Sequence, residues 1–401
     1  MDGITAVLAG AAAAVGAGLY YGTKRVVDKS KVRLVAAPLS GDKSDGCVRA
    51  IIEANCPSLV DPSQARLVPT PYLLNGMVHT IYCSTVALKK DSSSNIKYER
   101  EMRIMSDKGT VSLDWYPGRG GDSESTTPVV IVVTGLGGSS YEYHVRSLAK
   151  YLATKTNSKM RVVVANHRGC GRTPLTSSRL YNAYDTSDLA DVVDYIAQCF
   201  PKAPIGCVGY SMGANLLVRY LGERGDNTPL TAAVGVSSPF DASLTGRSMS
   251  KPGFLNDNVF QPAVMSTLKR TVMRNLDMIQ SGTIKYDIDA IMKAKRVSEL
   301  DNELTAKTYG FKDCWEYYAA GSTIESVDNI KRPFLDISAC DDPITPAAGI
   351  PLARIEKNPY TAVALVEYGG HIGFFTGLSP RIWVLKPIAE FLDAALVKSA
   401  E

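Results

Sequence analysis

The stretch from Pro204 to Leu221 constrains the fold more than any other part of the chain. It begins as a short apolar run, continues into the pentapeptide GYSMG at 209–213, and passes without a break into an amphipathic helical pattern. This is the sequence form of a strand, a tight turn and a helix that present a serine, Ser211, at the edge of a sheet. A serine on such a turn leaves no room for Cβ atoms two residues to either side, which accounts for the two glycines. The pattern is weak when taken alone, so the surrounding segments decide what it means.

Predicted strands and helices alternate around this stretch. Runs that are wholly or mostly apolar predict buried strands, and an amphipathic helical pattern follows most of them. The strands are expected at 97–105 and 110–116, which form a hairpin, and at 129–133, 160–165, 204–208, 232–237, 333–338 and 361–366. The helices are expected at 141–153, 186–200, 212–221, 264–276, 284–293 and 383–397. This alternation predicts right-handed βαβ units and a doubly wound, mostly parallel sheet of the α/β class.

The same patterns divide the chain into five segments. They are a membrane anchor with its basic flank, an N-terminal extension packed on the core, the first part of the α/β core, a helical cap insertion, and the second part of the core, at 1–33, 34–97, 98–238, 239–329 and 330–401. Within the extension, 49–53 predicts a short helix and 78–82 a strand-like run. The insertion loses the strand pattern altogether, and we interpret it as a cap over the candidate site.

The uncharged run from Ile4 to Gly22 is close to the ~20 residues that a membrane span needs. No basic segment precedes it, which favours a membrane anchor over a cleaved signal peptide or a mitochondrial presequence. Under the positive-inside rule, the basic residues after the span place the rest of the chain on the cytosolic side. The endoplasmic reticulum, the mitochondrial outer membrane and the lipid droplet all stay open as locations. These basic residues are Lys24, Arg25, Lys29, Lys31 and Arg33.

Small residues recur at every fourth position of the predicted span, at Gly10, Ala14, Gly18 and Gly22. On a helix they form one stripe, which allows another membrane helix to pack closely. The alternative is that small residues merely fill a span that is rich in alanine and glycine.

Composition excludes several classes of function. The net charge of +4 over 401 residues comes without a long basic run, so nucleic-acid binding is not indicated. The eight cysteines have no metal-binding spacing and are typical of buried apolar residues in a reducing compartment, with one or two disulfides left open. The glycine-rich loop at 134–140 matches neither a phosphate-binding nor a dinucleotide-binding pattern, so no cofactor is predicted. No cluster of histidine, aspartate or cysteine predicts a metal site.

A nucleophilic serine needs a base to take its proton and a carboxylate to orient that base. In the predicted arrangement these groups follow in the chain order serine, acid, histidine. Of the four histidines only His371 lies after Ser211, so it is the predicted base. The acid is expected in the loop after the strand at 333–338, where Asp341 and Asp342 are adjacent. We favour Asp342, four residues before Pro346, and keep Asp341 as the alternative.

Two backbone N–H groups are needed to hold a developing oxyanion. Met212, directly after the serine, supplies one, and the loop after the strand at 129–133 supplies the other through Leu136. Of the remaining histidines, His79 is interpreted as structural. His144 and His167 lie near the ends of sheet loops, and for these two we favour a structural role and keep a secondary role in the pocket as the alternative.

Several separated motifs resemble one known family when they are taken in order. They are PTPYLLNG at 69–76 with Thr80, DKGTVSLDW at 107–115, GLGGSS at 135–140, NHRGCG at 166–171 with Tyr181, GYSMG at 209–213, 305–310 with Tyr317 and Tyr318, DDP at 341–343, and GGHIG at 369–373. From about Pro69 onward the chain resembles the membrane-anchored α/β-hydrolases that include abhydrolase-domain acylglycerol lipases and phospholipases and the fungal medium-chain fatty-acid ethyl ester synthase/esterases. The resemblance implies an α/β-hydrolase fold and one N-terminal span.

Two features depart from this family. Thr134 stands where α/β-hydrolases commonly have a histidine before the glycine, and the residues at 77–79 replace the usual His-Leu-Gln. Neither change removes a catalytic group. The family is often described with its catalytic domain on the far side of the membrane, which disagrees with the cytosolic orientation that the charges favour.

The sequence therefore predicts a membrane-associated serine esterase or lipase that acts on a lipid-like ester, such as a medium-chain acyl ester, an acylglycerol or a phospholipid. With an alcohol as acceptor and acyl-CoA as donor, the same site would be an alcohol acyltransferase, and a thioesterase would differ in substrate more than in mechanism. The competing hypothesis is a non-catalytic, membrane-tethered scaffold. That hypothesis predicts a missing triad member, and none is missing.

Overall fold

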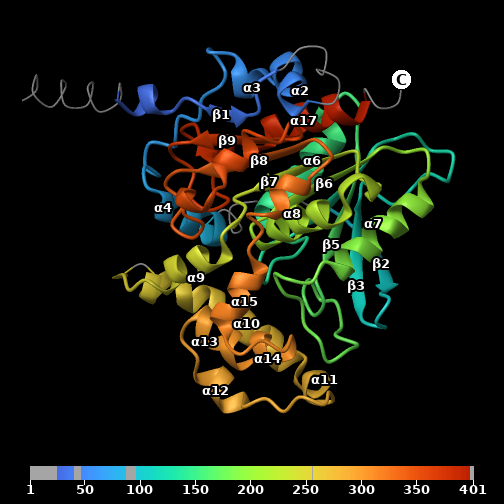
Figure 1. The fold of residues 1–401 in the computed structure, drawn as a ribbon, viewed down its shortest axis with the longest axis vertical. Helices are drawn as coiled ribbons and strands as arrows, with labels where there is room; N and C mark the ends of the chain where they lie inside the picture. The colour runs from blue at the N-terminus through green and yellow to red at the C-terminus, as the bar shows by residue number, and fades with distance from the viewer. Residues whose placement is uncertain (1–24, 40–46, 87–95, 255, 398–401) are drawn as a thin grey trace, which may run out of the picture.

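The computed structural model describes residues 25–39, 47–86, 96–254 and 256–397, and its centre is a nine-stranded sheet (Figure 1). The strands lie in the order β1-β9-β8-β7-β6-β4-β5-β3-β2. The six from β4 to β9 are parallel, whereas β3 runs antiparallel to β5, β2 to β3, and β1 to β9. This confirms the predicted α/β class with a mostly parallel sheet. The strands are β1 (Arg33–Ala36), β2 (Glu99–Ile104), β3 (Thr110–Tyr116), β4 (Val129–Val133), β5 (Arg161–Asn166), β6 (Ile205–Tyr210), β7 (Ala232–Val236), β8 (Phe334–Ala339) and β9 (Thr361–Val366).

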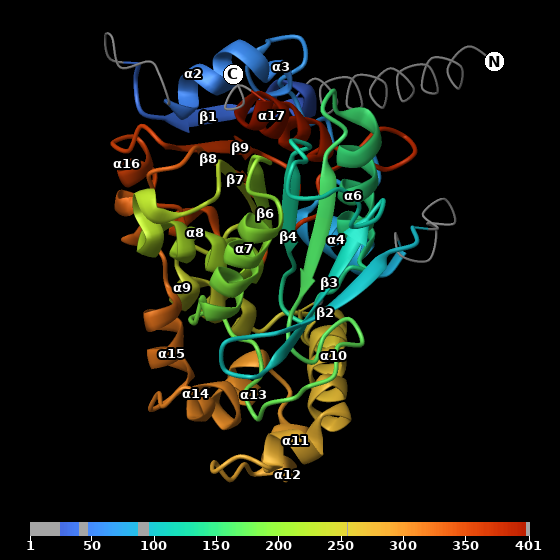
Figure 2. The same ribbon diagram turned by 90° about the vertical axis from the view of Figure 1, so that its right-hand side faces the viewer.

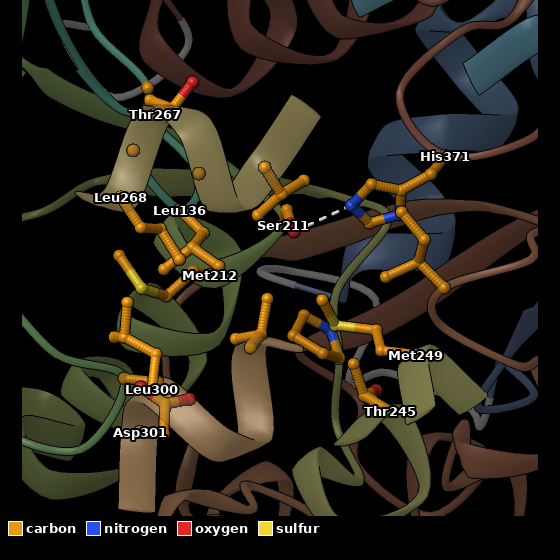
Figure 3. A pocket seen from close by; sticks show the side chains of 18 of the residues that line it. Leu136, Ser211, Met212, Thr245, Met249, Thr267, Leu268, Leu300, Asp301 and His371 are labelled. Atoms are coloured by element: carbon orange, nitrogen blue, oxygen red, sulfur yellow. Dashed lines mark hydrogen bonds between the residues drawn. The ribbon is translucent and has the colours of Figure 1, made fainter. Parts of the chain in front are cut away.

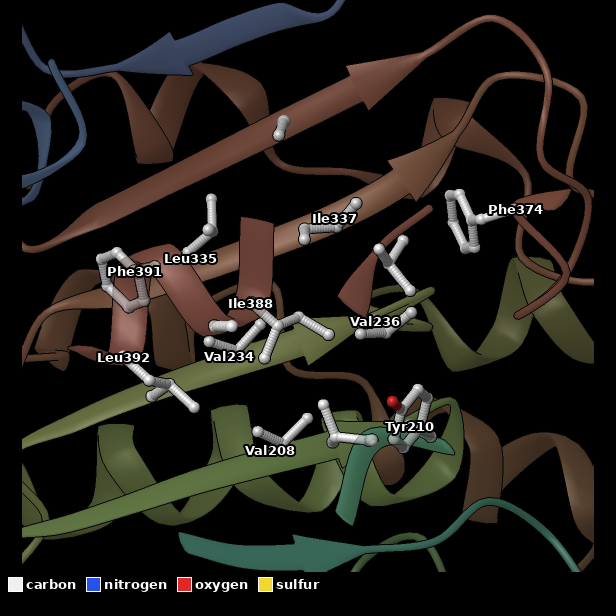
Figure 4. Packing of buried hydrophobic residues seen from close by; sticks show 14 of the residues in the cluster. Val208, Tyr210, Val234, Val236, Leu335, Ile337, Phe374, Ile388, Phe391 and Leu392 are labelled. Carbon is white, nitrogen blue, oxygen red and sulfur yellow. The ribbon is translucent and has the colours of Figure 1, made fainter. Parts of the chain in front are cut away.

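Helices cover both faces of the sheet because successive strand residues point to opposite sides. Val130 and Val132 of β4 pack in one hydrophobic cluster, and Ile131 and Val133 pack in the other. Figure 4 shows the first cluster, where α17 lies against β6, β7 and β8. Figure 2 shows α7 and α8 on one side of the sheet and α6 on the other. The helices of the two layers are α2 (Val48–Asn55), α3 (Pro57–Val60), α6 (Tyr143–Lys155) and α17 (Leu385–Val397), opposite α7 (Ser187–Cys199), α8 (Met212–Arg224) and α16 (Leu352–Ile355).

The N-terminal extension is more deeply built into the core than the sequence indicated. The sequence predicts no strand at 33–36, yet β1 joins the edge of the sheet and pairs Arg33 with Leu365 of β9. The helix predicted at 49–53 is present as α2. The predicted segment boundary between residues 33 and 34 therefore falls inside a strand.

The strand-like run predicted at 78–82 is also wrong, because the segment forms the helix α4 (Gly76–Ile81) followed by a π-helical turn, η1 (Tyr82–Val86). Asn75 begins the helix, and its side chain accepts a hydrogen bond from the backbone N–H of Met77 at 2.8 Å. Such a cap satisfies an N–H group that has no partner within the helix. α4 packs beside a two-stranded sheet of β10 (Phe375–Thr376) and β11 (Arg381–Ile382), where His79 stacks on the ring of Phe375.

A run of short helices lies between β7 and β8, at the lower end of the molecule in Figure 1. These helices have a hydrophobic cluster of their own, which includes Met265, Leu268 and Val272 from one helix and Leu300 from another. All of them fall within the segment predicted as an insertion. They are α9 (Ala242–Ser250), η3 (Asn256–Phe260), α10 (Gln261–Arg274), α11 (Leu276–Gln280), α12 (Ile288–Lys293), α13 (Val297–Glu303), α14 (Thr305–Thr308) and α15 (Cys314–Gly321).

The predicted membrane anchor, including its stripe of small residues, lies outside the described residues. Within the ranges that the structure does describe, no helix combines the length and the apolar character needed to cross a membrane. The eight cysteines carry free thiols, and all but Cys199 and Cys340 are buried.

Candidate active site

Ser211 occupies a strained turn between β6 and α8. Its backbone has φ 51° and ψ −119°, outside the region that non-glycine residues prefer. A Cβ added to Gly209 would lie 2.5 Å from the Cα of Ala214, and one added to Gly213 would lie 2.4 Å from the carbonyl oxygen of Val133. The two glycines are therefore required by close backbone approaches, as the sequence pattern indicated.

Ser211, His371 and Asp342 form a continuous line of hydrogen bonds. The distance from His371 Nε2 to Ser211 Oγ is 2.8 Å (Figure 3). The distance from His371 Nδ1 to Asp342 Oδ2 is also 2.8 Å. His371 and Asp342 are buried, and the backbone N–H of His371 donates to Thr80 Oγ1 of α4 at 2.9 Å. Asp342 accepts a hydrogen bond from the N–H at Nδ1 of His371. The neutral imidazole therefore has its lone pair at Nε2, facing the serine hydroxyl.

The two adjacent aspartates have different partners. Asp342 also accepts hydrogen bonds from the backbone N–H groups of Ile344 and Thr345, at 2.8 and 2.9 Å. Burial opposes its ionisation, but attraction to His371 and the hydrogen bonds from His371 and Thr345 outweigh burial and lower the pKa of the Asp342 carboxyl. Asp341 instead accepts from the backbone N–H of Gly370 at 2.8 Å. Of the two candidates, only Asp342 contacts the imidazole.

Asp341 has the opposite electrostatic environment. Burial raises the pKa of its carboxyl from 3.8 to about 6, although backbone N–H groups of the histidine loop partly stabilise the charge. The carboxyl therefore fixes the backbone next to His371 without touching the imidazole ring.

The loop predicted to supply an oxyanion donor lies directly against Ser211. A Cβ added to Gly135 would lie 3.2 Å from Ser211 Cβ, and both Leu136 and Met212 line the same cavity as the serine (Figure 3). The backbone N–H of Met212 is at the start of α8, where the helix dipole favours negative charge.

A buried polar network holds this loop, and the sequence reasoning missed it. The backbone N–H of Ser140 donates to Asn166 Oδ1 at 2.8 Å, the Ser140 hydroxyl donates to Asp114 Oδ2 at 2.5 Å, and Asn166 Nδ2 donates to the same oxygen at 2.8 Å. Arg100 neutralises Asp114 through two further hydrogen bonds of 2.7 Å. The available signal was an aspartate in the middle of the strand predicted at 110–116.

The other three histidines have local partners. His79 is buried and accepts from the backbone N–H of Phe375 at 3.2 Å, and burial lowers its pKa to about 4. His167 donates from Nε2 to the Thr134 carbonyl at 2.9 Å, and burial lowers its pKa as well. His144 packs edge-on against an aromatic ring, and burial lowers its pKa to about 3. Within the described residues, no group of three metal-binding side chains comes together.

A cavity of about 430 Å³ adjoins the serine and the imidazole. Most of its other walls are apolar and come from the inserted helices, with Met249 from α9, Leu268 from α10 and Leu300 from α13 (Figure 3). One buried carboxyl, Asp301, also lines the cavity and accepts hydrogen bonds from Thr305 and Tyr318, both at 2.7 Å. The cavity is suited to a long apolar group placed next to a nucleophile.

Comparisons with known proteins identify the family of the chain. A family model described as "alpha/beta hydrolase fold" matches residues 128–378. The chain is 34% identical to embryogenesis-associated protein EMB8 of Picea glauca over 77% of this chain and 67% of that protein. It is 32% identical to the phospholipase ABHD3 of Mus musculus over 72% of this chain and 69% of that protein. It is 30% identical to the medium-chain fatty acid ethyl ester synthase/esterase 2 of Saccharomyces cerevisiae over 84% of this chain and 86% of that protein.

Replacing Asp341 by Asn should flatten the pH dependence of stability between about pH 4 and pH 6. A carboxyl whose pKa is raised on folding stabilises the folded state at a pH below its unfolded pKa, and this contribution is lost as the pH rises through about 6. Asn keeps an acceptor for the N–H of Gly370 but does not titrate. Thermal unfolding midpoints from pH 4 to pH 7 measure the effect, with Asp122→Asn in an exposed loop as the control. Parallel curves of unfolding midpoint against pH for Asp341→Asn and the wild type would contradict the raised pKa of Asp341.

Proposed function

The chain belongs to the α/β-hydrolase family and is a carboxylic ester hydrolase, and we propose that it cleaves lipid-like esters with Ser211, His371 and Asp342 as a catalytic triad. The observation that carries this proposal is the unbroken hydrogen-bonded line from Asp342 through His371 to Ser211 at the wall of an apolar cavity. Nucleophile, base and orienting acid stand within hydrogen-bonding distance in the order that acyl transfer requires.

The reaction runs through an acyl-enzyme. Ser211 Oγ attacks the ester carbonyl while His371 Nε2 takes the hydroxyl proton, and Asp342 stabilises the imidazolium that forms. The backbone N–H groups of Leu136 and Met212 hold the oxyanion of the tetrahedral intermediate. The C–O bond of the ester then breaks, and His371 gives its proton to the departing alcohol. A water molecule, deprotonated by the same imidazole, releases the acid and restores Ser211.

The walls of the cavity favour an acyl chain over a small polar acyl group. Leu268, Val272, Leu300 and Leu304 come from the inserted helices, so the insertion acts as a cap that covers the acyl chain. Medium-chain acyl esters, acylglycerols and phospholipids all meet this requirement. The names of the relatives, a phospholipase and an ethyl ester synthase/esterase, support the same class.

Transfer of the acyl group to an alcohol is the second candidate. It is favoured by the likeness to the medium-chain fatty acid ethyl ester synthase/esterase of yeast, which extends over 84% of this chain. In that reaction acyl-CoA acylates Ser211 and ethanol replaces water in the second step. Incubating the enzyme with octanoyl-CoA and ethanol distinguishes the two, because hydrolysis alone gives octanoate without ethyl octanoate.

Replacing Ser211 by Ala should abolish labelling by a fluorophosphonate probe and lower turnover of an octanoate ester by about 10³- to 10⁶-fold, because the nucleophile is removed. Ser84→Ala, at another hydroxyl that lines the cavity, is the matched control and should label normally. A wild-type protein that fails to label while a reference serine hydrolase does would favour the non-catalytic scaffold instead.

Asp342→Asn should lower turnover by about 10³- to 10⁴-fold, since the imidazole loses the carboxylate that fixes its tautomer and stabilises its charge. Asp341→Asn, one residue away, should keep most of the activity because Asp341 contacts the backbone of the histidine loop and not the ring. Rates of ester hydrolysis for the two purified variants measure this. A larger loss of activity in Asp341→Asn than in Asp342→Asn would show that Asp341 is the acid of the triad.

We further propose that residues 4–22 anchor the protein in a membrane with the catalytic domain on the cytosolic side. The full chain should then stay in the membrane pellet after extraction at alkaline pH, because an inserted span is held by apolar burial and not by charge. Immunoblots of pellet and supernatant measure the distribution, and a chain lacking residues 1–24 provides the comparison. Release of the full chain into the supernatant would exclude the span.

A further inference from the structure

Five exposed apolar side chains lie on two adjoining segments, 68–78 and 375–382, and we call them the apolar rim: Val68, Tyr72, Leu74, Val78 and Leu378. Leu378 is 82% exposed, Tyr72 57% and Leu74 52%. Single exposed apolar residues are ordinary on a protein surface, but a group of them usually marks a binding surface.

The apolar rim is formed by two segments that are tied together. The Tyr72 hydroxyl donates to the carbonyl of Leu378 at 3.3 Å, and the Thr376 hydroxyl donates to the carbonyl of Val68 at 2.7 Å. Between them, the backbone N–H of Thr70 donates to the carbonyl of Phe375 at 3.1 Å. The side chains are thus presented from a hydrogen-bonded frame, so their exposure is built into the fold.

The apolar rim borders the opening of the active-site cavity. Of the residues that line the cavity, the exposed ones are Ser84, Ala263 and Thr267, which places the opening between η1 and α10. Ser84 continues the same helical segment that carries Val78. On the α10 side of the opening, η3 contributes Val259 and Phe260 to the lining, and Phe254, which is 80% exposed, lies just before η3 in the chain. Exposed apolar side chains therefore belong to the segments that adjoin both sides of the opening.

The geometry points to a lipid surface as the partner: we propose that the apolar rim and Phe254 dock into a bilayer, so that the cavity opens directly into it. The segment 68–78 contains no charged residue, and 375–382 contains only Arg381. Burying the segment 68–78 among lipid tails therefore removes apolar surface from water without desolvating a charged group, and the long side chain of Arg381 lets its guanidinium stay at the polar surface of the bilayer. A surface that binds a protein partner usually has polar or charged residues at its margin.

The start of the described chain supports the same partner. The start of the described chain, α4 and α9 all lie on the left-hand side of the molecule in Figure 1. The predicted span at 4–22 ends only two residues before the described chain begins, so a bilayer that holds the span must lie close to Arg25. A bilayer on that side of the molecule also meets the apolar rim.

The test uses the full chain in phosphatidylcholine vesicles and two esters. It rests on the proposed function only because the rate of ester hydrolysis is what is measured. Tyr72→Ser/Leu378→Ser should hydrolyse mono-octanoylglycerol in the bilayer about tenfold more slowly than the wild type, since two anchoring side chains are lost. Hydrolysis of 4-nitrophenyl butyrate in the surrounding buffer should be unchanged. Met102→Ser/Ile104→Ser, with two exposed apolar residues on β2, is the matched control and should leave both rates intact. An equal effect on both esters, or none, would overturn the proposal.

A second measurement does not require activity. An environment-sensitive fluorophore placed at Leu378→Cys, in a background with the exposed Cys340 replaced by Ser, should shift to the blue and be quenched by doxyl-labelled phosphatidylcholine. The same fluorophore at Ile104→Cys should remain in water. Identical spectra at the two positions would contradict docking of the apolar rim into the bilayer. Self-association of the protein that only the rim variant abolishes would instead show that the apolar rim binds a second copy of the chain. A Ser211→Ala protein that still hydrolyses both esters would refute the proposed function and leave this result standing.

Discussion

The strained backbone of Ser211 is the constraint on which the rest of the site depends. A non-glycine residue in that conformation costs about 1–3 kcal/mol, and it persists only where its surroundings leave no alternative. Here the backbone N–H of Ser211 donates to the carbonyl of Val236 at 2.9 Å, and Gly209 and Gly213 let β6, α8 and β4 close around the turn. The turn lifts the hydroxyl out of the sheet, where it meets the imidazole of His371. These residues are 160 positions apart in the chain, so the sheet order from β6 to β9 is what brings them together.

The acid and histidine loops depend in turn on the N-terminal extension. A Cβ added to Gly76 would lie 1.9 Å from the carbonyl oxygen of Asp341, and one added to Gly370 would lie 2.1 Å from the carbonyl oxygen of Gly76. Thr80, one turn further along α4, accepts from the backbone N–H of His371. α4 thus packs against both loops at backbone contact distance, which makes the extension a structural part of the active site.

The sequence predicted the parts of this site that rest on local pattern. The strand and helix around Ser211 follow from periodicity and from the two glycines, and His371 follows by elimination because no other histidine comes later. The sequence did not predict the role of α4, because the apolar pattern at 78–82 fits a strand as well as a helix. The outcome depends on the Asn75 cap and on packing against residues about 290 positions away. β1 was missed for a similar reason, since four residues carry little periodic signal before their partner strand is known.

The pair Asp341 and Asp342 shows how neighbouring residues acquire separate roles. Both are carboxyls with little access to water, yet the pKa of Asp342 is lowered and that of Asp341 is raised to about 6. The difference arises because Asp342 faces the imidazole of His371 and the donors of Thr345, whereas Asp341 faces only backbone N–H groups. As the pH falls, Asp341 takes up a proton first, and the negative charge stays on the carboxyl that is hydrogen-bonded to the imidazole of His371. The adjacent carboxyl can therefore hold the histidine loop by hydrogen bonding without competing for the imidazolium that would form in the proposed acyl transfer.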